Sequence, residues 1–284
     1  MVTRSKWKCT LQNLHSHTVF SDGLNTPEEL ILDAMSKGFD SIGFSEHSYI
    51  SWLDDKWLMP DKTFEYLALL DELKEKYRGV FSVFKGLELD ACSEVQPGNF
   101  DYIIGNVHYK PMWDGGFMEY CHNQIYTAKK YIYYYDFDIM EYARDYFEHY
   151  LSNFERTHID IAGHFDALTK FDSTYPDLFH FDFKEYRDLA LQVLHATFEK
   201  CEIFEVNSGL MGRGQKTVPS PEPFLLKELK NLGGKVCVTT DCHSTEFVDL
   251  CFDEVLELLL SIGFESIVVL TDHGFVEEKI IGRD

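Results

Sequence analysis

At 284 residues, 45% of them hydrophobic, the chain is long enough to form a substantial core in one large domain or two small ones. Its formal net charge of −22 argues against general nucleic-acid binding, which requires a basic surface. Seven scattered cysteines without a C-x-x-C pair indicate reduced thiols, and we find neither a signal-peptide pattern nor an apolar run of membrane-spanning length. We therefore expect a cytoplasmic protein with no nucleic-acid or membrane partner.

Strand-like and helical patterns alternate along the chain. Residues 7–12 alternate as a strand does, and Thr26-Pro27-Glu28-Glu29 carries the cap, proline and acids of a helix start. Further strands are predicted at residues 39–44, 80–87, 102–107, 159–162, 203–206, 236–240 and 266–270. Further helices are predicted at residues 61–77, 183–199, 221–233 and 247–262, with an aromatic-rich, largely helical insertion at 110–156. This alternation, without linker or repeat, predicts one α/β domain of residues 1–284 with a mainly parallel sheet.

Side chains that bind metals stand where the predicted strands end. His15 and His17 are two residues apart in an extended segment, so their imidazoles project to the same face, and Asp22 is close along the loop. Alone this motif is weak, because 12 histidines give roughly half an H-x-H by chance. The later strand ends add six more candidates: His47, Glu88, His108, His164, Asp241 and His243. In a parallel β/α barrel, functional residues gather at these ends.

This set of nitrogen and oxygen donors suits zinc, manganese or iron(II). It is too large for one ion, and a carboxylate such as Glu88 can bridge two, so we expect two or three divalent ions. Such clusters activate water and clamp phosphoryl oxygens. We interpret the remaining histidines as structural: His122, His149, His158, His180, His195 and His273. His273 follows Asp272 directly, so the two side chains would diverge.

The motifs H-S-H with S-D-G, E-H-S, G-L-E, N-V-H, G-H-F-D and T-D-C-H run in this order along essentially the whole chain. This series resembles that of the PHP (polymerase and histidinol phosphatase) superfamily, above all its monofunctional histidinol-phosphatase branch. The resemblance implies a distorted (β/α)7 barrel and a trinuclear metal site. One ion would take His15, His17, Glu88 and Asp241; a second Glu88, His108 and His164; the third Asp22, His47 and His243.

The resemblance also implies an activity, the hydrolysis of L-histidinol phosphate by a metal-bound hydroxide in histidine biosynthesis. Glu88, Asp241 and His243 would be the catalytic residues. Two alternatives stay open: a PHP phosphoesterase acting on another small phosphomonoester or a nucleotide, and a non-catalytic metal-binding regulatory module. The substrate would be a small phosphorylated molecule, and the sequence leaves the oligomeric state open.

A glycine-rich segment at residues 207–216 provides candidates for substrate binding. It resembles the family's loop after the sixth strand, where an arginine meets the phosphate. A planar guanidinium can bind phosphoryl oxygens in a bidentate manner, so we predict that Arg213 binds substrate together with Asn207 and Lys216. For Lys216 a solvated basic loop is an equal alternative. Cys242 is predicted to point away from Asp241 and His243 and to pack in the core.

Overall fold

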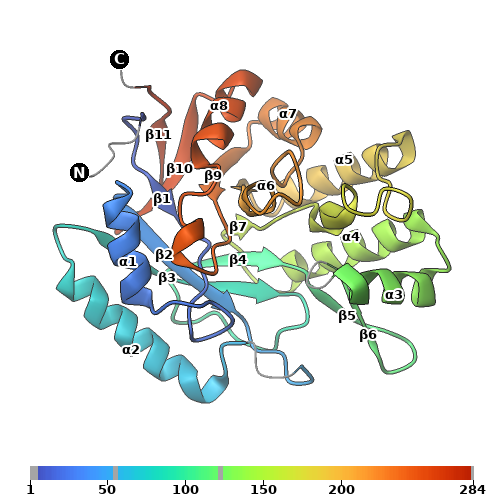
Figure 1. Cartoon of the computed structure of the whole chain (residues 1–284), viewed down its shortest axis with the longest axis horizontal. Helices are drawn as coiled ribbons and strands as arrows, with labels where there is room; N and C mark the ends of the chain where they lie inside the picture. Colours follow the sequence, from blue (N-terminus) through green and yellow to red (C-terminus); the bar gives the residue numbers. More distant parts are fainter. Residues whose placement is uncertain (1–5, 54–56, 121–123, 283–284) are drawn as a thin grey trace.

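Seven parallel strands form the centre of the structure, a computed structural model that describes residues 6–53, 57–120 and 124–282 (Figure 1). Their order in the sheet is β1-β2-β3-β4-β7-β8-β9. Strands of this sheet that follow one another along the chain therefore also lie side by side. The bounds are β1 Gln12–Asn13, β2 Ser41–His47, β3 Ser82–Asp90, β4 Tyr102–Asn106, β7 Ile161–Ala162, β8 Ile203–Asn207 and β9 Lys235–Thr239. The predicted strands all appear, and the prediction of a mainly parallel sheet is confirmed.

The sheet curls until its first and last strands meet just beyond their ends. The Cys242 N–H donates to the His15 carbonyl at 3.2 Å, and the His17 N–H donates to the Cys242 carbonyl at 2.8 Å. These two bonds pair Ser16 with Cys242 in parallel and close the sheet into a barrel at its carboxyl end. The first strand, Gln12–Asn13, overlaps the predicted 7–12 only at Gln12, and Trp7 instead forms an isolated antiparallel bridge with Gly282 near the other end of the chain.

One tyrosine occupies the inside of the barrel. Tyr102 is buried in a cluster with Leu14 and other interior side chains, and its hydroxyl donates to the Leu14 carbonyl. A Cβ at Gly43 would lie 2.3 Å from the Tyr102 hydroxyl oxygen, and a Cβ at Gly86 would lie 2.2 Å from its ring. The glycines of β2 and β3 therefore make room for the ring that fills the barrel beneath the strand ends.

Helices cover the outside of the barrel (Figure 1). The long ones are α1 Pro27–Ser36, α2 Pro60–Lys76, α3 Gln124–Tyr135, α4 Ile139–Arg156, α5 Lys184–Phe198, α7 Pro223–Leu232 and α8 Phe252–Ile262. The capping box predicted for the first of them is present, with the Thr26 side chain accepting from the Glu29 N–H. Short 3₁₀ turns, Ala167–Phe171 (η1) and Thr245–Phe247 (η2), follow β7 and β9 and were not predicted. No helix among the described residues is long and apolar enough to cross a membrane.

The predicted helical insertion at 110–156 begins with an unpredicted hairpin. Strands β5 (Tyr109–Pro111) and β6 (Phe117–Glu119) pair antiparallel before α3 and α4 begin. Residues 121–123 lie outside the described part of the chain. Tyr131 and Tyr135 pack their rings against Tyr142 of α4, so these tyrosines attach one helix to the next.

A second unpredicted hairpin ends the described chain. The last predicted strand is β10 (Ser266–Thr271), and β11 (Gly274–Lys279) folds back on it. The carboxamide of Gln12 in β1 donates to the Leu270 carbonyl at 2.9 Å and accepts from the Leu270 N–H at 2.6 Å. Because β10 also packs beside β9, this hairpin fills the space between the first and last barrel strands. His273 is exposed at the hairpin tip, as expected for a structural histidine.

Candidate metal centre

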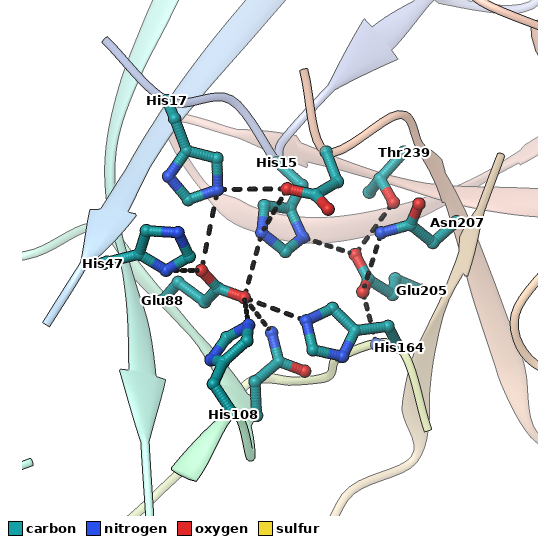
Figure 2. Close-up of polar contacts among 12 residues, drawn as sticks. His15, His17, His47, Glu88, His108, His164, Glu205, Asn207 and Thr239 are labelled. Atoms are coloured by element: carbon teal, nitrogen blue, oxygen red, sulfur yellow. Dashed lines mark hydrogen bonds and ion pairs between the residues drawn. The ribbon is translucent and has the colours of Figure 1, made fainter. Parts of the chain in front are cut away.

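The predicted metal ligands converge at the carboxyl end of the barrel. His15 and His17 follow β1, His47 ends β2, and Glu88 lies in β3. His108 and His164 come just after β4 and β7, Asp241 and His243 follow β9, and Asp22 lies in the loop before α1. Figure 2 shows five of these imidazoles arranged around one carboxylate, Glu88. The structure therefore brings together all the side chains that the sequence nominated for metal binding.

The Glu88 carboxylate faces imidazoles with both of its oxygens. Its Oε1 is 3.0 to 3.3 Å from the Nε2 atoms of His164, His15 and His108. Its Oε2 is 2.5 Å from His47 Nδ1 and 3.5 Å from His17 Nε2. A carboxylate that bridges two ions must present each of its oxygens to a different set of ligands, and the Glu88 carboxylate does so.

Two aspartates complete the arrangement at its sides. Asp241 Oδ1 is 3.1 Å from His17 Nε2 and 3.5 Å from His15 Nε2. Asp22 Oδ1 is 3.2 Å from His243 Nε2 and 3.5 Å from His47 Nε2. The ligand atoms form three groups within 4.8 Å: His15–His17–Asp241, His17–Asp22–His47–His243 and His47–Glu88–His108. The groups overlap with the expected sets but differ from them in four ways. His17 also joins Asp22, His47 and His243, and His47 also joins Glu88 and His108. Glu88 is absent from the first group, and His164 belongs to none of the three, although its Nε2 is 3.0 Å from Glu88 Oε1.

These atoms have the character of metal ligands. His15 Nε2, both ring nitrogens of His17, His47 Nδ1, Asp22 Oδ1 and Glu88 Oε2 are buried and make no hydrogen bond of acceptable geometry with any described residue. Buried polar atoms are rarely left unpaired, because the lost hydration costs free energy. Divalent ions would satisfy one ring nitrogen of each of these imidazoles together with the two carboxylate oxygens. The residues present therefore fit the metals that the sequence implies.

The charges of the cluster shift its pKa values strongly. Burial lowers the pKa of His108, but Glu88 and Asp90 more than offset it and raise the value to about 9. The same balance of burial against facing carboxylates raises the pKa of His15 and of His47 well above the ordinary value. His17 differs, because burial and the neighbouring imidazoles lower its pKa to about 3. Metal ions must therefore displace protons from several imidazoles.

A cavity of about 290 Å³ opens beside the cluster. Part of its lining consists of proposed metal ligands: Asp22, His47, His108, His164, Asp241 and His243. The rest comes from the end of β8 and from the segments after β7, β8 and β9: Ala167, Lys170, Asn207, Leu210, Arg213, Gln215, Ser220 and Phe247. A ligand in this cavity would therefore be in reach of the proposed metal ligands and of a mixed polar and apolar surface.

Arg213 and Asn207 line this cavity. The glycine-rich segment is less irregular than expected, since the short helix α6 (Gly209–Gly212) precedes Arg213. The Arg213 guanidinium donates to the Asp241 carbonyl at 3.1 Å and lies 3.5 Å from the Asp241 carboxylate. Asn207 accepts from the Gly209 N–H at 2.9 Å and so shapes the start of α6. Of these two side chains, Arg213 is the one with most N–H groups left for a ligand in the cavity, because the Asn207 carboxamide donates to Glu205 at 3.3 Å.

Lys216 does not take the predicted position. Its side chain is only 3% exposed, and its ammonium donates to Thr169 Oγ1 and Glu222 Oε1, each at 2.6 Å, with Asp172 at 3.3 Å. Burial lowers the pKa of Lys216, but the surrounding acids more than offset it, so the charge is kept. The ammonium therefore faces partly buried acids, and Lys216 is not among the residues that line the cavity, so the structure does not support the prediction that Lys216 binds substrate.

The other histidines stand outside the three groups of ligand atoms. His158, His180, His195 and His273 are exposed, and His149 contacts the thiol of Cys92. His122 lies outside the described residues. Cys242 is fully buried in the main hydrophobic cluster, as predicted, and burial raises the pKa of its thiol to about 11.

Buried acids behind the ligands were missed. Glu205 Oε2 is 2.8 Å from His15 Nδ1, and Asp90 Oδ2 is 3.2 Å from His108 Nδ1. A third, Glu46, accepts from the Thr18 N–H and hydroxyl. Two signals were available in the sequence: Asp90 lies two residues from Glu88 on the same face of β3, and Glu205 interrupts an apolar strand.

Comparison with known proteins places this arrangement in a family. A family model described as PHP domain matches residues 13–209, more than two thirds of the chain. The chain belongs to the PHP domain family. The match begins two residues before His15 and ends after β8, so Asp241 and His243 of this PHP domain protein lie beyond it and reach the site through β9.

Its relatives carry a consistent name. The PHP domain protein is 24% identical over 272 residues to a Schizosaccharomyces pombe protein named probable histidinol-phosphatase, a match that covers 86% of this chain and 83% of the relative. A Deinococcus radiodurans protein of the same name is 28% identical over 178 residues, 57% of this chain and 63% of the relative. Histidinol phosphate phosphatase from Lactococcus lactis, solved with zinc, L-histidinol and phosphate, has the same fold at a TM-score of 0.71 and 20% identity, over 94% of this chain and 99% of that one.

Proposed function

We propose that this PHP domain protein hydrolyses L-histidinol phosphate to L-histidinol and phosphate, as a step of histidine biosynthesis. One observation carries the proposal: unpaired buried nitrogen and oxygen atoms surround Glu88 and border a cavity that Arg213 also lines. The two curated relatives described above, both named probable histidinol-phosphatase, support the choice of substrate.

Two to three divalent ions, zinc, manganese or iron, would be held by the set that the sequence nominated. His15, His17, Glu88 and Asp241 would hold the first, Glu88, His108 and His164 the second, and Asp22, His47 and His243 the third. Bound there, such ions activate water and neutralise the charge of phosphoryl oxygens during displacement. Glu88, Asp241 and His243 act in this reaction as the residues that hold those ions beside the cavity.

Arg213 would bind the phosphoryl group from the side of Asp241. Its guanidinium keeps N–H groups available because the contacts to Asp241 use only part of its five donors. Charge-assisted bonds to phosphoryl oxygens are among the strongest hydrogen bonds available to a protein. Arg213 thus fixes the direction in which phosphorus faces the metal centre, and Asn207 holds the helix turn that presents it.

Other residues that line the cavity suit the rest of the substrate. The carboxamide oxygen of Gln215 is buried and makes no hydrogen bond with any described residue, so it can accept an N–H. Leu210 and Phe247 add apolar surface in the same cavity. L-Histidinol phosphate offers both complements, an ammonium or imidazole N–H and a planar ring. The net charge of −22 also favours a substrate that carries an amine.

We further propose that residues 1–284 form a single domain in which 110–156 is an insertion. The support is the closure of the barrel, because β9 and the segment after it supply Asp241 and His243 to the centre built from the first strands.

The test is phosphate release by the metal-loaded protein from L-histidinol phosphate, nucleoside monophosphates and a simple alkyl phosphate, with metal content measured on the same sample. We expect kcat/KM for L-histidinol phosphate to exceed the others by about 100-fold. A higher value with a nucleotide would assign another phosphomonoester as the substrate. Full metal content without turnover of any ester would instead indicate a regulatory metal-binding module.

A further inference from the structure

Glu205, in the middle of β8, is completely buried behind the metal centre and is not one of its proposed ligands. We infer that Glu205 is a positioning residue that orients one ligand of the first proposed ion and one of the second. The inference rests on the proposed metal site but not on the identity of the substrate.

Four donors converge on the Glu205 carboxylate, two on each oxygen (Figure 2). Oε2 is 2.8 Å from His15 Nδ1 and accepts from the Thr239 hydroxyl at 2.8 Å. Oε1 accepts from the backbone N–H of His164 and from the Asn207 carboxamide at 3.3 Å. These donors come from segments at the ends of β1, β7, β8 and β9, so one side chain joins four strands.

The contact with His15 fixes which ring nitrogen can bind metal. A carboxylate surrounded by donors accepts hydrogen bonds only, so Nδ1 of His15 must carry the hydrogen. The other nitrogen, Nε2, lies 3.3 Å from Glu88 Oε1 and 3.5 Å from Asp241 Oδ1, and it is the one that would give its lone pair to an ion bound there. A carboxylate on the far nitrogen also makes an imidazole a stronger ligand.

The contact with His164 works through the backbone. Because Glu205 holds the His164 N–H, the chain leaves β7 in a fixed direction, and the His164 ring reaches Glu88 Oε1 with its Nε2 at 3.0 Å. His15 belongs to the first proposed ion and His164 to the second. A single carboxylate therefore controls the geometry on both sides of the Glu88 bridge.

Two other buried acids provide the comparison. Among the proposed ligands, Asp90 hydrogen-bonds only His108, a ligand of the second ion, through its ring nitrogen and backbone N–H, while its other oxygen accepts from the Cys92 N–H. Glu46 is as buried as Glu205, but its hydrogen bonds go to Thr18 and Ser21 and to no proposed ligand. Replacing Glu46 thus removes a buried charge whose hydrogen bonds reach the chain neighbours of His17 and Asp22 but neither ligand itself.

The experiment is metal titration of the metal-stripped full chain, with stoichiometry and Kd from competition against a chelator, for wild type, Glu205→Gln, Asp90→Asn and Glu46→Gln. A carboxamide has one acceptor oxygen, so Glu205→Gln leaves the donors on one side facing an NH₂ group. We expect a loss of affinity of about 10- to 100-fold for two ions in Glu205→Gln. Asp90→Asn should weaken one ion only, and Glu46→Gln should bind as wild type does.

Thr239→Val is the second variant in case Glu205→Gln does not fold, because it removes one donor from Glu205 without changing a charge. It should lower affinity for the first ion by a smaller factor, about threefold. The inference would be overturned if folded Glu205→Gln bound metal with the affinity and stoichiometry of wild type. If only Thr239→Val folds, wild-type affinity and stoichiometry in that variant would overturn it. An equal loss in Glu46→Gln would overturn it as well, since buried charge alone would then explain the effect. Neither result depends on whether L-histidinol phosphate is the substrate.

Discussion

The carboxamide of Asn106 donates to Glu88 Oε1 at 2.6 Å, from the neighbouring strand and directly beneath the metal centre. This bond fixes the plane of the Glu88 carboxylate, so that its oxygens divide the surrounding imidazoles between them. The bridging position assigned to Glu88 depends on that orientation.

Glu88→Gln should therefore lose more activity than any other single change among the proposed ligands. A carboxamide binds divalent ions weakly, and its NH₂ group would face imidazoles that now face an oxygen. Metal content and turnover should fall together, and Asp22→Asn, at the edge of the cluster, should lose less of both. A Glu88→Gln protein with full metal content and a near-normal rate would contradict the bridging role.

Arg213→Ala should lower kcat/KM for the phosphate ester and raise KM, because a charge-assisted contact to the phosphoryl group is lost. The expected loss of transition-state stabilisation is about 2–4 kcal/mol. Metal content should be unchanged, which separates this role from ligation. Unaltered kinetics would indicate that another side chain binds the phosphate, for example Lys170, which also lines the cavity.

Lys216→Met should destabilise the fold by about 3–5 kcal/mol, because it leaves Asp166, Asp172 and Glu222 without their buried cation. Denaturant unfolding measures this difference directly. The control is Lys184→Met, which breaks an ion pair whose lysine is 85% exposed and should leave stability nearly unchanged. Equal stability of the two variants would show that the acidic cluster does not need the lysine.

Metal binding should release protons at pH 7. The pKa of His108 is raised to about 9 in the metal-free protein, so its imidazole is charged at pH 7 and must lose a proton to bind an ion. Metal affinity should consequently rise with pH up to about 9. The stability of the metal-free fold should depend on pH in the opposite direction. The raised pKa of His108 stabilises this fold fully below about pH 6.5, and the stabilisation is lost as the pH rises through about 9. Calorimetry in buffers of different ionisation enthalpy counts the released protons, and a count of zero at pH 7 would contradict the assignment.

Gln215→Met should alter specificity more than rate. If the carboxamide oxygen accepts an N–H of the substrate, kcat/KM for L-histidinol phosphate should fall by about 10- to 100-fold, while that for glycerol phosphate should not change. Ethanolamine phosphate, which has an ammonium and no imidazole, shows which group is recognised. An equal fall for every ester would indicate a structural role for Gln215.

The sequence predicted the proposed ligands because their placement follows simple rules. Carboxyl ends of parallel strands meet at one edge, and residues two apart in an extended segment share a face, which brings His15 and His17 to Glu88. Lys216 was misassigned because its acidic partners, Asp166, Asp172 and Glu222, are separated from it along the chain and from one another. A lysine in a glycine-rich loop gives no indication of the direction its ammonium takes.

The remaining misses have physical causes too. Strand β11 was missed because Glu277, Glu278 and Lys279 are charged and give it no apolar pattern. Glu205 was missed because a carboxylate within a strand normally indicates a solvent-facing side, whereas here the barrel interior supplies four donors to it. Such partners can be identified only once the strands are arranged around the barrel.

The pairing of Ser16 with Cys242 has a thermodynamic consequence. Each of these residues is flanked on both sides by proposed ligands, His15 and His17 on one strand end and Asp241 and His243 on the other. The first proposed ion, held by His15 and His17 on one strand end and by Asp241 on the other, would be bound across the seam where the barrel closes, and it would bind the closed form alone. Free energy of metal binding is then free energy of closure: an ion at 100 times its Kd adds about 2.7 kcal/mol to the closed state. Metal binding would thus hold the first and last strands of this barrel together in addition to the hydrogen bonds between them. Removal of the ions by a chelator should therefore let the backbone amides at this seam exchange with solvent sooner than those in the rest of the sheet.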